Sequence, residues 1–215
     1  MKPTLLRLSF LAALWTPTAL AADGVGLAME VSAAVTVMID GEAKPLEPLT
    51  KLREGDAVSV PAGGLVEVMY FAGGKVERWS GPAEVTVSAS GGASDGVTPA
   101  VSGGASMGTA LAGLDSLAER ARSSAGGHTL VRGGPLEDAE LEAEEQAEVD
   151  AARGEYAKMR EGAPSTDVMP ELYLAGILVS YELDKQAATV LEDAAKRCPS
   201  CSAPKALLAL MKGDE

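Results

Sequence analysis

The chain has 215 residues, of which 31 are acidic and 18 basic, so its formal net charge at pH 7 is −13. Nucleic acids and anionic lipid surfaces require a positively charged contact surface, so neither is expected as a partner. Aromatic residues make up only 4% of the chain, which leaves little from which to build a stacking platform for bases or sugars. One histidine and two cysteines limit metal and nucleophilic chemistry.

The first 21 residues have the pattern of a secretory signal peptide. Lys2 and Arg7 precede or flank an apolar run over residues 8–15, and Ala19-Leu20-Ala21 is a small-x-small cleavage pattern. The run is short for a membrane span, so we expect an exported, periplasmic protein with residues 1–21 removed. The alternative is an uncleaved N-terminal anchor. No later segment approaches twenty apolar residues, so no span is expected in the mature chain.

Residues 25–88 predict an all-β domain. Apolar and polar residues alternate with a period of two, which is typical of half-buried strands. The alternating segments are 35–39, 58–60, 66–70 and 85–87. Asp40-Gly41 and Gly73-Gly74 predict tight turns, because glycine adopts positive φ without steric strain. We expect a sandwich or open barrel of roughly six or seven strands that buries the valines.

The turn residues of this domain resemble those of FecR-type periplasmic domains. The resemblance lies in Leu52-x-x-Gly55-Asp56-x-Val58, a strand to Phe71, a glycine hairpin and a closing Gly81-Pro-Ala-Glu-Val. Two departures are Ala72-Gly73-Gly74 in place of an Asp-Gly hairpin and Ser32-Ala33-Ala34 in place of a glycine. The resemblance implies a periplasmic interaction module. It does not carry over transmembrane signalling to a sigma factor, because no cytoplasmic segment is evident.

Three segments connect this domain to the rest of the chain. Residues 89–108 are rich in Ser, Gly and Ala and predict a flexible linker. Residues 109–125 predict a helix, because Leu111, Leu114 and Leu117 form an apolar stripe at helical spacing. Residues 129–134 read as a short extended piece.

Residues 135–215 predict an α-helical domain that resembles tetratricopeptide (TPR) repeats. The good repeat is carried by Leu174, Ala175 and Leu178 in one helix and by Ala187, Leu191 and Ala194 in the next, followed by Pro199. A degenerate earlier repeat would place its second helix at Ala152, Tyr156 and Met159 and end at Pro164. The alternatives are an ordinary helical hairpin, and one long solvated helix running to Met159. The predicted fold class is therefore α+β, with two segregated domains.

The pair Cys198-Pro-Ser-Cys201 has C-x-x-C spacing. In thioredoxin-like enzymes this motif follows a strand and opens a helix, whereas here it lies between two predicted helices. In an oxidising compartment we expect a local disulfide. Free or metal-bound thiols, and a redox-active pair, are the alternatives. A zinc site would need two further ligands, and the only histidine, His128, lies in a glycine loop far along the chain.

We expect a non-enzymatic periplasmic scaffold or protein-interaction module of an envelope assembly or signalling system. No cofactor, metal or catalytic residue is predicted, and the acidic residues at 137–150 fit a solvated helix face better than a cation loop. Expected partners are other envelope proteins or peptides, with candidate contacts at Leu172, Tyr173, Tyr181 and Trp79. The alternatives are a thiol/disulfide redox protein using Cys198 and Cys201, and a cell-wall glycan-binding module.

Overall fold

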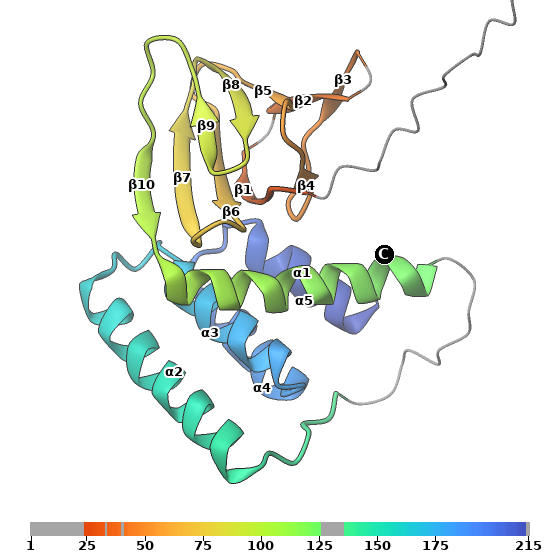
Figure 1. Cartoon of the computed structure of the whole chain (residues 1–215), viewed down its shortest axis with the longest axis vertical. Coiled ribbons are helices and arrows are strands. Elements are labelled where there is room, and N and C mark those ends of the chain that lie inside the picture. Colours follow the sequence, from red (N-terminus) through yellow and green to blue (C-terminus); the bar gives the residue numbers. More distant parts are fainter. Residues whose placement is uncertain (1–23, 33, 40, 126–135, 214–215) are drawn as a thin grey trace, which may run out of the picture.

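The computed structural model describes residues 24–32, 34–39, 41–125 and 136–213. All of its strands precede all of its helices, which confirms the division into an N-terminal β part and a C-terminal α part. The helices gather at one end of the β-sandwich, with α1 directly beneath it and α2 farthest from the strands (Figure 1). The signal-type segment 1–21 and the extended piece 129–134 lie outside the described residues.

Two five-stranded antiparallel sheets form the sandwich. Sheet A has the order β10 (Ala100–Gly103), β7 (Lys75–Ser80), β6 (Leu65–Tyr70), β1 (Gly26–Val31) and β4 (Lys51–Leu52). Sheet B has the order β3 (Glu42–Pro45), β2 (Thr36–Ile39), β5 (Ala57–Val60), β8 (Ala83–Ser88) and β9 (Gly91–Ala93). The described part of the chain therefore holds more strands than the sequence led us to expect.

The inner faces of the two sheets form the first apolar core. The alternation predicted from the sequence is present in β8, where Val85 and Val87 are buried while Glu84 and Thr86 are exposed. Most of the core consists of valines from both sheets, with Tyr70 and Trp79 as the largest fully buried side chains. Because alternate side chains of a strand point to the same face, the valines of both sheets fill the space between them.

Five helices are described: α1 (Ala105–Ala125), α2 (Ala143–Gly162), α3 (Met169–Ser180), α4 (Asp184–Arg197) and α5 (Ala203–Lys212). The central helix is α3, which is apolar around its whole circumference and buried from Pro170 to Val179. A helix with apolar residues on every face is stable only when neighbours surround it. None of the described helices is both long and apolar enough to cross a membrane.

The helices and the sandwich share a second apolar core. Leu27, Met69 and Val76 are paired across β1, β6 and β7 and point away from sheet B. They belong to the same buried cluster as Leu111 and Leu114 of α1 and the core of α3. The helices therefore cover part of the outer face of sheet A, while Arg78 and Ser80 of β7 stay exposed. The outer face of sheet B has no covering layer among the described residues.

The segment 89–108 differs from the expected flexible linker, because it contains β9, β10 and the start of α1. Its glycines have a packing role. A Cβ added to Gly91 would lie 2.3 Å from Nζ of Lys75, and one added to Gly92 would lie 2.7 Å from Cγ1 of Val85. Small residues here let β9 approach β7. Composition alone does not distinguish such a packed Gly-rich strand from a solvated Gly-rich linker.

The early helical repeat is also not formed as a pair. Residues 136–142 are not helical, and α2 is one long helix in which only Val149 and Ala152 are buried. This matches the alternative of a single solvated helix. The acidic residues that precede α2 offer no apolar stripe with which to pack a further helix.

Helices α1 and α3 cross at two glycines. A Cβ on Gly113 would lie 2.0 Å from the carbonyl oxygen of Gly176, and a Cβ on Gly176 would lie 2.2 Å from that of Ala110. Real Cβ atoms do not approach a backbone oxygen so closely, so any side chain at either position must push the helices apart. Since α1 lies between α3 and the sheet, this crossing sets how tightly the helices pack on sheet A.

We expect Gly176→Ala to destabilise the protein by about 1–3 kcal/mol, because the added methyl overpacks the crossing. The matched control is Gly154→Ala in α2, where an added Cβ meets nothing within 4 Å. That substitution should stabilise the helix by about 0.5–1 kcal/mol. Urea unfolding followed by circular dichroism measures both. Equal effects of the two alanines would contradict the close crossing.

Candidate functional site

The first candidate site is the junction at which the Cys198–Cys201 turn meets sheet A. Strand β1 contains a β-bulge at this junction. Ala28 pairs with Val68 but Glu30 pairs with Glu67, so Met29 is an extra residue in β1. An extra residue reverses the alternation of the residues that follow it. The bulge therefore turns Glu30 from the sandwich interior to the outer face of sheet A, towards the helices.

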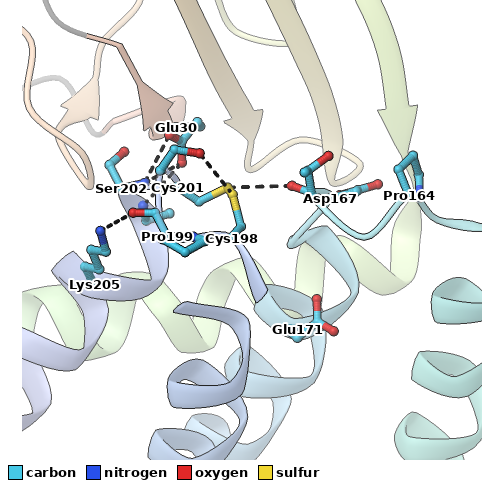
Figure 2. Close-up of a disulfide and its surroundings, with 12 residues drawn as sticks. Glu30, Pro164, Asp167, Glu171, Cys198, Pro199, Cys201, Ser202 and Lys205 are labelled. Carbon is cyan, nitrogen blue, oxygen red and sulfur yellow. Dashed lines mark hydrogen bonds between the residues drawn. A yellow bond between two sulfur atoms is a disulfide. The ribbon is translucent and has the colours of Figure 1, made fainter. Parts of the chain in front are cut away.

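Glu30 binds the N-terminus of α5. Its carboxylate accepts hydrogen bonds from the backbone N–H groups of Ser202, at 2.8 and 3.0 Å, and of Ala203, at 3.4 Å. In return, the N–H of Val31 donates to Oγ of Ser202 at 3.3 Å. The first N–H groups of a helix have no intrahelical partner, and the helix dipole favours a negative charge there. Figure 2 shows Glu30 beside Ser202, directly next to the disulfide.

The cysteines are joined as a disulfide whose Cα atoms lie 5.4 Å apart. Cys198 directly follows α4 and is 3% exposed, while Cys201 precedes Ser202 and is half-buried. Sγ of Cys201 lies 3.6 Å from the carbonyl oxygen of Thr166, in the segment between α2 and α3. The bridge thus holds together the turn that presents α5 to Glu30.

Carboxylates surround this turn. A cavity of about 20 Å³ is lined by Glu30, Glu67, Arg78, residues 166–168 and Cys201, which is room for one water molecule. Glu67 is 9% exposed and pairs with Arg78 at 3.3 Å. Burial raises the pKa of Glu67, Arg78 lowers it, and the nearby Asp167 and Glu30 raise it further. This acidic setting disfavours a cysteine thiolate, which needs positive surroundings to form near neutral pH.

A buried carboxylate ties the helices together behind the junction. Glu171 of α3 is 1% exposed and pairs with Arg160 of α2 at 3.1 Å and with Arg197 of α4. Tyr156 donates a hydrogen bond to it at 3.2 Å. Burial and the Glu171 charge raise the pKa of Tyr156, and the hydrogen bond with Glu171 raises that of Arg197. Removing one partner of such a pair would leave a buried charge uncompensated.

The second candidate site is a groove on the outer face of sheet B, on the side away from the helices. Its volume is about 690 Å³, within the range of sites that take small ligands or short peptide segments. Ser59, Glu84 and Thr86 point out of the sheet, Pro61 and Pro82 lie beside them, and the segment after β9 closes another side. The full lining is Ser59, Val60, Pro61, Pro82, Ala83, Glu84, Thr86, Ala93, Ser94 and Asp95.

Most of the predicted contact residues lie inside the protein. Leu172 is 1% exposed, Tyr173 5% and Trp79 1%, so these three side chains fill the cores and offer no contact surface. Trp79 donates a hydrogen bond from Nε1 to Glu77 at 3.2 Å. Tyr181 is half-buried and its hydroxyl binds Glu148 of α2. Aromatic residues at helical spacing thus indicated the core here.

The sequence predicted neither the groove nor the capping of α5 by Glu30. The groove is built from small and polar residues of β5, β8 and β9, which are far apart in the sequence and carry no motif. Within the described part of the chain, no group of three or more His, Cys, Asp or Glu side chains is arranged to hold a metal ion. Compared with known proteins, the chain matches no family model, no curated protein and no solved structure.

We expect Glu30→Ala to destabilise the protein by about 0.5–2 kcal/mol, the range measured for lost helix caps. Glu47→Ala is the control, because Glu47 is an exposed acid that does not take part in binding the N-terminus of α5. Hydrogen exchange at the first amides of α5 should rise in the Glu30 variant alone. Unchanged protection of those amides would contradict the capping role.

The raised pKa of Glu67 predicts a pH-dependent stability. The folded state binds the Glu67 proton more tightly than the unfolded chain does, because the pKa of Glu67 in the unfolded chain has its ordinary value of 4.5. Stability from this group is therefore present below pH 4.5 and is lost as the pH rises through the folded pKa. The free energy of unfolding of Glu67→Gln, minus that of the wild type, should increase between about pH 4 and pH 7. A flat or falling difference would contradict the raised pKa.

Proposed function

We propose that this protein is a non-enzymatic interaction module of the periplasm, which holds a partner protein or peptide on the outer face of sheet B. The observation that carries the proposal is the groove of about 690 Å³ on the sheet face that the helices leave uncovered. The helices cover part of the outer face of sheet A, around Leu27, Met69 and Val76. The helix layer then serves to stiffen the sandwich.

The membership of known families is part of this proposal. The Leu52-x-x-Gly55-Asp56 turn and the glycine hairpin support a FecR-like sandwich, and the buried Ala175, Ala187 and Leu191 support a TPR-like pairing of α3 with α4. The signal-type residues 1–21 support export. An oxidising compartment also suits the disulfide at the junction.

The geometry favours a structural role for the cysteine pair over thiol exchange. Cys198 is buried, the α5 N-terminus that would stabilise a thiolate already binds Glu30, and Glu67 and Asp167 lie close by. Each of these features raises the free energy of a thiolate. The glycan-binding alternative would use the same face of sheet B. The crosslinking experiment below distinguishes a glycan ligand from a protein ligand.

Site-specific photo-crosslinking in living cells tests the proposal. The crosslinking amino acid p-benzoylphenylalanine replaces Thr86, an exposed groove residue, and in a control replaces Ala147, an exposed residue of α2. We expect a discrete protein adduct at Thr86 and none at Ala147. Adducts at Ala147 alone, or adducts at Thr86 with cell-wall glycan in place of protein, would overturn it, as would recovery of the chain from the cytoplasm on fractionation.

A further inference from the structure

The groove on sheet B has a one-sided charge. Glu84 of β8 and Asp95, just after β9, are both exposed, and the lining contains no lysine or arginine. Three hydroxyl-bearing residues, Ser59, Thr86 and Ser94, complete its polar lining. Glu84 accepts a hydrogen bond from Ser59 at 2.5 Å. Neither acid forms an ion pair with a described residue, so their charges are left uncompensated in the part of the chain that the structure covers.

These two acids differ from the acids that the fold uses. Glu30 caps α5, Asp138 accepts hydrogen bonds from the N–H groups of Lys185 and Gln186 at the start of α4, and Glu171 pairs with two arginines. Among the described residues, Glu84 accepts a hydrogen bond only from the neutral hydroxyl of Ser59, and neither Glu84 nor Asp95 caps a helix or pairs with a cation. Their charge therefore adds repulsion to a chain that already carries a net −13.

The rest of the lining suits the aliphatic part of a long basic side chain. Pro61 and Pro82 flank the groove, and the exposed Ala93 adds a small apolar surface, whereas Val60 and Ala83 are buried beneath it. Lysine and arginine side chains lay their methylene stems on such surfaces and place the charged end on a carboxylate. A groove with prolines beside two exposed carboxylates that form no ion pair is therefore complementary in charge to a basic segment.

We propose that the sheet B groove binds a short extended segment of a partner protein that carries lysine or arginine. This rests on the proposed function and names the chemistry of its partner. A second copy of the chain does not fit, because two copies of this face would bring like charges together. A glycan fits less well, since the groove has no aromatic side chain on which a sugar ring would stack. The net negative charge of the chain also speeds the approach of a cationic partner.

Fluorescence anisotropy with a labelled Lys-Val-Lys-Val-Lys-Val peptide tests this proposal. The full-length protein should bind it, and a peptide with Gln in place of every Lys should bind at least about tenfold more weakly. The double variant Glu84→Gln/Asp95→Asn should weaken binding of the lysine peptide by about tenfold, which corresponds to two modest ion pairs. Its circular dichroism spectrum should match that of the wild type.

The control is Glu54→Gln/Glu161→Gln, which removes the same net charge from two exposed acids outside the groove. It should weaken binding by less than about twofold. Equal losses in both double variants would show general electrostatic attraction and overturn the groove as the site, as would failure of the wild type to bind. If the Thr86 crosslink persists at its wild-type yield in Glu84→Gln/Asp95→Asn, the cationic partner is overturned while the interaction function stands.

Discussion

The structure depends on the burial of sheet A between two cores. Leu27, Met69 and Val76 bind the strands to the helices on one side, and the valines of both sheets bind the sandwich together on the other. Apolar area removed from water is the main favourable term in folding, and here the same sheet contributes to it twice. Without the helices, Leu27, Met69 and Val76 would form an exposed apolar surface on sheet A. The division of the sequence into a β half and an α half is therefore not a division into independent packing units.

The polar contacts follow from this arrangement. Once the helices lie on sheet A, the N-terminus of α5 is brought against β1, and its unpaired N–H groups need an acceptor. The bulge at Met29 supplies one by turning Glu30 outwards, and the disulfide fixes the turn in which Ser202 is presented. Glu171 of α3 pairs with Arg160 of α2 and Arg197 of α4, and so joins these three helices. Glu30 thus closes a helix end, and the buried Glu171 pairs with an arginine from each of two neighbouring helices.

The sequence predicted the features that depend on local periodicity. The alternating valines follow from a period of two and the buried stripe of α4 from a period of 3.6. The positive φ of Gly41, Gly73 and Gly74 follows from the turns that these glycines predict. It did not predict features that depend on packing between distant segments. The small residues of 89–108 pair as strands because glycines fit against Lys75 and Val85, and Tyr173 and Trp79 lie in cores because helices and sheets enclose them. The bulge in β1 adds a single residue to the strand, which is too local a change to alter the sequence pattern. The sheet B groove is lined by residues of three strands that share no motif.

The pairing of Glu30 with Ser202 joins residues that are 172 positions apart. The first strand therefore acquires its last neighbour only when the final helix is present, and contacts of such long sequence separation form late and slowly. During synthesis the carboxylate of Glu30 in β1 has no helix end to bind until residues 202 and 203 have been added, although α1, which also packs on sheet A, is complete long before.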